Sequence, residues 1–123
     1  MIYSVSKRME IAAAHQLKLS YESKCQNLHG HNWIITVYLV SCNKLNQDGM
    51  ILDFKHIKNK IHARLDHAYI NEVIPYNPTA ENMARWVVEQ FPECYKAVVQ
   101  ESEGNIAQAV DETKIKGIES LVR

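Results

Sequence analysis

The sequence predicts one α+β domain over residues 1–123, in which an antiparallel four-stranded sheet carries two helices on one face, in the order ββααββ. Two segments near the start and two near the end favour strands, and the middle of the chain carries apolar residues at helical spacing. Hydrophobic residues make up 46% of the chain and charged residues 23%, which is typical of globular proteins. A disordered tail, a collagen-like fibre and a coiled coil are thereby excluded.

Two strands are expected in the first third of the chain. Residues 3–15 alternate, and the more apolar face is formed by Tyr3, Val5, Met9, Ile11, Ala13 and His15. Lys7 lies on that same face, which a β-bulge or an edge position would explain. Residues 16–28 are polar and irregular, which indicates a loop, and residues 31–42 are rich in the residue types that favour strands.

The two helices are marked by their capping residues. Asp53 can accept hydrogen bonds from the first turn of one helix, and Thr79 can do the same for a second helix, which Pro92 ends. The expected buried residues are Phe54, Ile57, Ile61 and Leu65 in the first helix, and Met83, Trp86, Val87, Gln90 and Phe91 in the second.

Two further strands complete the predicted sheet. Residues 97–103 and 105–111 are joined at Gly104-Asn105, where glycine permits the positive φ of a tight hairpin. Residues 114–123 show no pattern that assigns them to an element. Such a sheet leaves exposed edges, which a homo-oligomer could pair.

Three histidines are expected to meet at one end of this sheet. His29 and His31 point to the same side of an extended chain, because residues two apart share a face. His15 ends the first strand on its apolar side, so a hairpin through residues 16–28 brings it to the same place. Three neutral imidazoles leave one position open on Zn²⁺, as in catalytic rather than structural sites. Three unrelated histidines are the alternative, because a His-x-His pair alone is a weak signal.

Three other positions could carry chemistry. Cys25 precedes His29 by four residues, so its thiol would lie near the metal, although a lone cysteine is more often inert. Asp66 can orient the adjacent His67 as a proton carrier, or the pair can be a polar helix end. Glu101 lies within a strand, either on its wet face or holding a heterocycle that presents adjacent N–H and NH₂ donors.

Charge and cysteine content limit the partners and the compartment. Fourteen basic and fourteen acidic residues balance, so strong nonspecific binding to nucleic acid or to a membrane is disfavoured. The three cysteines are an odd number, which argues against a disulfide framework. Residues 1–10 lack the apolar stretch of a secretory signal, so we expect a cytoplasmic location. The residues expected to be inert or on the surface are Cys42, Cys94, His56 and His62.

Six short motifs together resemble the 6-pyruvoyltetrahydropterin synthase / 6-carboxytetrahydropterin synthase family over about residues 3–107. The matching motifs are Ala13-Ala14-His15, Cys25-Gln26-Asn27-Leu28-His29-Gly30-His31-Asn32, Gly49-Met50-Ile51-Leu52-Asp53-Phe54, Leu65-Asp66-His67, Asn77-Pro78-Thr79-Ala80-Glu81-Asn82 and Glu101-Ser102. Their common order along the chain argues against chance. The chain departs from the family pattern in three places. Ser102 stands where many members have threonine, and the aromatic residue that many members have shortly after the position of Ala107 is missing. The tail from residue 111 has no counterpart in the family pattern.

The resemblance implies the tunnelling fold, in which ββααββ subunits form trimers, two trimers stack into a hexamer, and the sites lie between subunits. The site residues it implies are His15, His29 and His31 for Zn²⁺, Cys25, Asp66 and His67 for proton transfer, and Glu101 for the pterin, with Thr79 as a helix cap that could also contact the substrate.

Within the family, the Cys-x-x-x-His-Gly-His spacing after Lys24 is most similar to bacterial 6-carboxytetrahydropterin synthase. The resemblance implies a carbon–carbon lyase that converts 7,8-dihydroneopterin triphosphate to 6-carboxy-5,6,7,8-tetrahydropterin, acetaldehyde and triphosphate, on the route to queuosine and other deazapurines. The same residues could instead support a 6-pyruvoyltetrahydropterin synthase, which eliminates triphosphate and keeps the side chain. A non-catalytic zinc or pterin-binding module is a further interpretation, and a purely structural zinc domain would need a fourth protein ligand.

Overall fold

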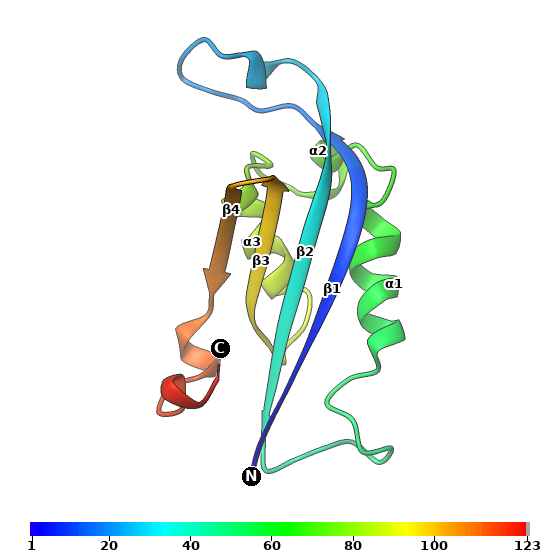
Figure 1. Ribbon diagram of the computed structural model, residues 1–123, viewed down its shortest axis with the longest axis vertical. Helices are drawn as coiled ribbons and strands as arrows, with labels where there is room; N and C mark the ends of the chain where they lie inside the picture. The colour runs from blue at the N-terminus through cyan, green and yellow to red at the C-terminus, as the bar shows by residue number, and fades with distance from the viewer. Residues whose placement is uncertain (123) are drawn as a thin grey trace.

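The computed structural model describes residues 1–122 and contains one antiparallel sheet with its helices on one face (Figure 1). The elements are β1 (Ile2–His15), β2 (His29–Cys42), α1 (Phe54–Leu65), α2 (Ile70–Val73), α3 (Ala80–Glu89), β3 (Cys94–Ser102) and β4 (Asn105–Val110). The strands lie in the order β1-β2-β3-β4, with each antiparallel to its neighbour. The predicted α+β class and the four-stranded sheet with two main helices are therefore confirmed.

The long β1–β2 hairpin positions the histidines. Its two strands pair without interruption from Ile2, opposite Cys42, to His15, opposite His29. In this register Ala13 lies opposite His31, so His15, His29 and His31 share the face that the helices cover. Figure 1 shows this end of the hairpin extending beyond β3 and β4 into the loop of residues 16–28.

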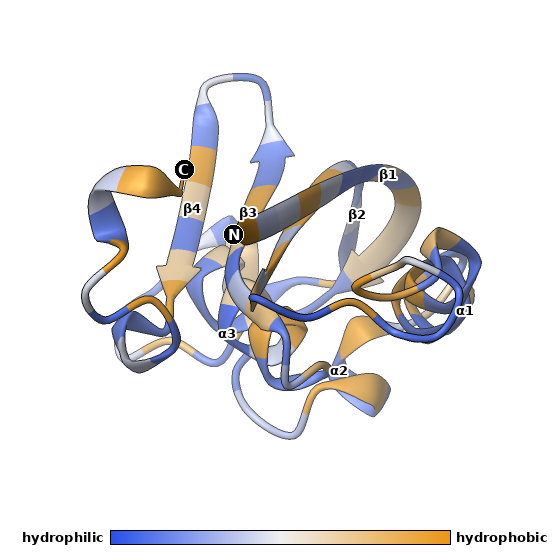
Figure 2. Cartoon of the chain, turned by 90° about the horizontal axis from the view of Figure 1, so that it is seen from below, coloured by the Kyte–Doolittle hydropathy of each residue, from blue (hydrophilic) through white to orange (hydrophobic). Residues whose placement is uncertain are grey.

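The core lies between the sheet and the two longer helices. The fully buried side chains of α1 are Ile57, Ile61 and Leu65, and those of α3 are Met83, Ala84 and Val87. Trp86 and Phe91 are also buried, as predicted, whereas Gln90 is half-buried and donates through Nε2 to the Trp86 carbonyl. Figure 2 shows that α1 and α3 each carry both hydrophobic and hydrophilic stretches, as expected for helices with one buried face.

Both predicted helix caps are present. The Asp53 carboxylate accepts from the Lys55 amide, and the Thr79 hydroxyl accepts from the Asn82 amide. The prediction that Phe54 is buried is wrong, because its side chain is 49% exposed and the Lys7 ammonium lies 5.9 Å from the centre of its ring. Lys7 itself pairs regularly with Val37 on the edge strand β1, so an edge position rather than a bulge explains it.

Two strands start earlier than predicted, and one short helix was not predicted. β2 begins at His29, two residues before the predicted start at His31, because His29 and Gly30 pair with the last residues of β1. β3 begins at Cys94, three residues before the predicted start at residue 97, and the side chains of Cys94 and Tyr95 are buried. The short helix α2 was not predicted, since its four residues give no helical period. Gly104 takes φ of +83° in the β3–β4 turn, as expected.

The tail after β4 folds back onto the chain. A short turn at Glu112–Lys114 is capped by Asp111, and the Lys114 ammonium donates to the carbonyls of Phe91 and Cys94. Ile115 then packs with Val40 and Tyr95 in a second, small apolar cluster. The tail therefore has local structure up to residue 122, and Arg123 lies outside the described residues.

Candidate metal centre and adjoining cavity

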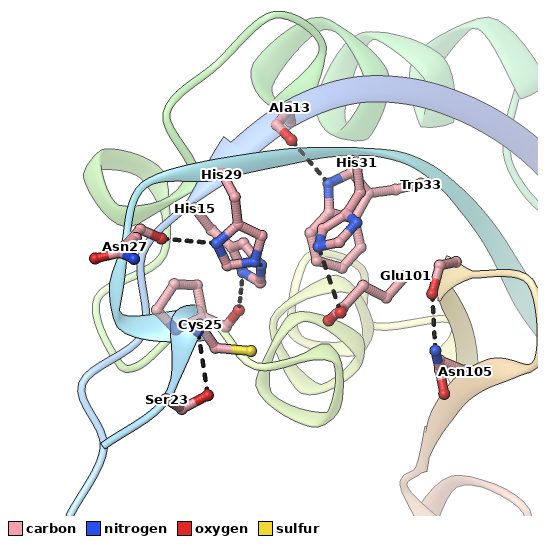
Figure 3. Close-up of polar contacts among 12 residues, drawn as sticks. Ala13, His15, Ser23, Cys25, Asn27, His29, His31, Trp33, Glu101 and Asn105 are labelled. Carbon is pink, nitrogen blue, oxygen red and sulfur yellow. Dashed lines mark hydrogen bonds and ion pairs between the residues drawn. The ribbon is translucent and has the colours of Figure 1, made fainter. Parts of the chain in front are cut away.

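The three predicted histidine ligands meet at the end of the β1–β2 hairpin (Figure 3). One nitrogen from each of His15, His29 and His31 lies within 4.8 Å of the other two. The His15 side chain is completely buried, and its Nε2 lies 3.0 Å from the Nε2 of His29. A tetrahedral zinc ion with Zn–N bonds near 2.0–2.1 Å needs nitrogens about 3.3 Å apart, so small side-chain shifts would accommodate one.

Two backbone carbonyls fix the orientation of two of these rings. His15 Nδ1 lies 2.8 Å from the Pro78 oxygen, and His29 Nδ1 lies 2.7 Å from the Asn27 oxygen. A carbonyl only accepts, so both Nδ1 atoms carry the hydrogen and both neutral rings present an unprotonated Nε2 to the other. Two lone pairs 3.0 Å apart repel unless a cation or a proton lies between them. Orientation through the second ring nitrogen is also typical of metal-bound histidine.

His31 completes the donor set and links it to Glu101. The Nε2 atom of His31 is buried and has no hydrogen-bond partner among the described residues, with Glu101 Oε1 as a near charge at 3.4 Å. A buried nitrogen left without a partner is costly in a native protein, and a metal ion would relieve that cost. The residues present therefore fit a metal ion with three imidazole ligands and one open position.

The surroundings favour the neutral form of His15. Burial lowers the pKa of His15, and the nearby His29 lowers it further, against the hydrogen bond to Pro78, which raises it. The Trp33 ring packs edge-on against His15 and His31 at centroid distances of 4.8 and 5.1 Å, and its indole N–H donates to the Ala13 carbonyl. Trp33 thus packs against two of the three histidines and helps to hold their rings in place. Its position two residues after His31, on the same face of the strand, could have identified this supporting role from the sequence.

A cavity of about 460 Å³ lies next to His31 through Glu101, and three more predicted residues line it. Cys25, Thr79 and Glu101 all line it, and Glu81 from the first turn of α3 lines it as well. In Figure 3 the Glu101 carboxylate points toward His31. The half-buried Cys25 lies in the short turn Lys24–Gln26, which Ser23 caps. A thiol, a hydroxyl and a carboxylate beside a metal site can bind and deprotonate a polar ligand.

The Asp66–His67 pair lies elsewhere in the chain. Asp66 ends α1, and its Oδ1 accepts from the Ala12 amide, which lowers the pKa of this carboxyl. Its Oδ2 lies 3.6 Å from His67 Nε2 and 3.7 Å from His62 Nε2, so His62 is half-buried beside it rather than on the open surface. The His67 side chain is 83% exposed and lines a different cavity, of about 490 Å³, which His31 also lines but Cys25 does not. Within one chain the structure therefore does not bring His67 to the Cys25 cavity.

The remaining cysteines are free and lie apart from these residues. Cys42 is exposed at the end of β2, and Cys94 is buried, which raises the pKa of its thiol. None of the helices over residues 1–122 is both long and apolar enough to span a membrane.

Known proteins share this fold and show the family of the chain. Residues 4–112 match the family described as 6-pyruvoyl tetrahydropterin synthase, and the chain belongs to that family. It is 33% identical over 101 residues to a 6-carboxy-5,6,7,8-tetrahydropterin synthase of Synechocystis, covering 75% of this chain and 77% of that protein. It is 24% identical over 117 residues to the Bacillus subtilis protein of the same name, covering 81% and 80%. The fold is that of Caenorhabditis elegans 6-pyruvoyl tetrahydropterin synthase, with a TM-score of 0.70 and 24% identity over 89% of this chain and 96% of that one. The chain is thus an enzyme of the pterin synthases, a family with lyase-type chemistry, and it has their tunnelling fold.

Proposed function

We propose that the protein is a zinc-dependent 6-carboxy-5,6,7,8-tetrahydropterin synthase. Its substrate would be 7,8-dihydroneopterin triphosphate, and its products 6-carboxy-5,6,7,8-tetrahydropterin, acetaldehyde and triphosphate, as a step toward queuosine and other deazapurines. The observation that carries the proposal is the convergence of three imidazole nitrogens beside a cavity lined by a thiol and a carboxylate. The names of the Synechocystis and Bacillus subtilis relatives support the 6-carboxy branch. A cytoplasmic location stays a prediction.

The side chains have distinct proposed roles. His15, His29 and His31 would hold the zinc ion, which supplies a Lewis acid that makes hydroxyl and neighbouring C–H protons more acidic. Glu101 would accept two hydrogen bonds from adjacent N–H and NH₂ donors on the pterin edge. Cys25, as thiolate, would remove a proton from the substrate.

Asp66 and His67 would form the second proton-transfer group. Asp66 lies close enough to the imidazole to orient it, and it would stabilise the protonated ring. Because His67 is exposed and lines another cavity, its use at the Cys25 cavity requires a second copy of the chain. We therefore propose a homo-oligomer with sites between subunits, a hexamer formed by two trimers. The exposed Ile106 and Val110 on the edge strand β4 support such an assembly.

Product identification tests the proposed reaction. Zinc-loaded protein incubated with 7,8-dihydroneopterin triphosphate is expected to release acetaldehyde together with a 6-carboxy pterin. The alternative reaction, favoured by the family description, is 6-pyruvoyltetrahydropterin formation, which yields triphosphate without acetaldehyde. Absence of acetaldehyde from zinc-loaded protein would refute the 6-carboxy assignment.

The Cys25→Ala variant separates an enzyme from a pterin-binding module. Turnover is expected to be abolished while zinc content stays equal to that of the wild type, because Cys25 is not one of the three clustered ligands. Cys42→Ala is a matched control, since Cys42 is exposed at the far end of β2 and should keep full turnover. Turnover that survives in Cys25→Ala would remove the thiol from the mechanism.

A further inference from the structure

We propose that Asn71 and Asn77 are positioning residues that hold the catalytic loop of Cys25 in place. The inference rests on the proposed function, in which the Cys25 thiolate moves a proton. Both asparagines lie in the connection between α1 and α3, which contains α2 and lies beside the loop end of β1 in Figure 1. The hydrogen bonds of both side chains go to the backbone of Gln16 and Lys18, so their effect on Cys25 passes through the backbone.

The outer edge of β1 is paired by this connection rather than by another strand. The Ala12 amide donates to Asp66 Oδ1, and the His67 amide donates to the Ala12 carbonyl at 2.7 Å. The Ala14 amide then donates to the Ala68 carbonyl at 3.1 Å. Every second residue at the end of β1 therefore has partners on this side, in the pattern of a strand edge.

The two asparagine side chains continue that pattern past the end of β1. Asn71 accepts from the Gln16 amide at 2.9 Å and donates to the Gln16 carbonyl at 2.7 Å. Asn77 accepts from the Lys18 amide at 2.9 Å and donates to the Lys18 carbonyl at 2.9 Å. A side-chain amide has one acceptor and one donor group side by side, so each asparagine takes the place of a strand residue.

The opposite edge of the same segment holds the Cys25 turn. The Leu17 amide donates to the Cys25 carbonyl at 3.0 Å. Gln16 Nε2 donates to the Gln26 carbonyl at 2.9 Å, and Gln26 Nε2 donates back to the Leu19 carbonyl at 3.4 Å. The Cys25 turn is therefore bonded to an extended segment whose backbone groups on the other edge pair with Asn71 and Asn77, while the Tyr69 hydroxyl donates only to the Gln16 side chain, at 3.3 Å.

Replacement of each asparagine by aspartate tests this arrangement with almost no change in shape. A carboxylate can accept from the amide but cannot donate, so it faces the Gln16 or Lys18 carbonyl as a repelling oxygen. In the double variant Asn71→Asp/Asn77→Asp we expect kcat to fall about tenfold or more with a smaller change in KM, because a displaced catalytic group lowers the rate of the chemical step. Zinc content should stay at the wild-type level. Asn46→Asp is the matched control, because the Asn46 side chain only accepts, from Asp48 and Met50, in a distant loop.

Alkylation of Cys25 by iodoacetamide, followed by peptide mass spectrometry on zinc-loaded protein, gives a second readout that needs no substrate. Release of the turn should raise the alkylation rate at Cys25 about fivefold or more, with Cys42 in the same sample as internal reference. Alkylation and kcat within about twofold of the wild type would overturn the inference, as would loss of zinc in parallel with kcat. If the double variant does not fold, the two single variants are measured in the same way. A wild type without synthase activity would refute the proposed function, while the alkylation result would still decide the role of the asparagines.

Discussion

The Thr79 hydroxyl has two assigned tasks, capping of α3 and contact with the substrate, and substitutions can separate them. Thr79 Oγ1 accepts from the Asn82 amide at 3.1 Å, and the side chain also lines the Cys25 cavity. Thr79→Ala removes both the cap and the hydroxyl. Loss of an N-cap threonine costs about 1 kcal/mol, within a range of about 0.5–2 kcal/mol. For a chain of 123 residues, a loss of about 1 kcal/mol corresponds to a fall in Tm of roughly 3–6 °C.

Thr79→Asn is the informative companion variant. Asparagine caps helices at least as well as threonine, so the Tm of metal-free Thr79→Asn should stay within about 2 °C of the wild type. Its side chain lacks the hydroxyl that is proposed to contact the substrate, so KM should rise in both variants. Thermal unfolding followed by circular dichroism, with steady-state kinetics, measures both effects. An unchanged Tm in Thr79→Ala would refute the cap reasoning, and an unchanged KM in Thr79→Asn would refute the substrate contact.

Three further predictions concern individual side chains of the site. Because the pKa of His15 is lowered in the folded state, the unfolded chain binds a proton more readily than the folded one. Metal-free protein should therefore lose stability as pH falls below about 6.5, by at most about 1.4 kcal/mol per pH unit from this group. Urea titrations at pH 7.5 and 5.5 measure this loss, which should be absent in His15→Gln. Glu101→Gln should raise KM about tenfold or more while zinc content is retained, since an amide nitrogen replaces one of the two acceptor oxygens. An unchanged KM would refute the proposed contact between Glu101 and the pterin. Trp33→Phe leaves the Ala13 carbonyl without its indole donor and should cost about 1–3 kcal/mol in urea unfolding, so an unaltered midpoint would contradict the support assigned to Trp33.

The clustering of the three histidines was predictable because strand geometry is regular. Alternation along residues 3–15 places His15 on the apolar face, and the His-x-His spacing places His29 and His31 together. An uninterrupted hairpin then fixes His15 opposite His29. Helix caps at Asp53 and Thr79 are similarly local, so they too could be recognised from the sequence.

The features that the sequence did not predict depend on contacts between distant segments of the chain. Phe54 fits the helical period but lies at the first turn of α1, beyond the sheet edge, where Lys7 is its neighbour. The roles of Asn71 and Asn77 depend on a strand continuing past His15, in a region that reads as polar loop. The separation of His67 from Cys25 follows from the course of the chain after α1, which no local pattern encodes.

The metal content of purified protein tests the three-histidine centre most directly. After zinc loading and removal of excess metal, elemental analysis should find about one zinc per chain in the wild type. His15→Ala and His29→Ala should each bind far less, whereas His56→Ala, an exposed histidine on α1, should match the wild type. A wild type that retains no stoichiometric metal, or triad variants that retain as much as the His56→Ala control, would contradict the account.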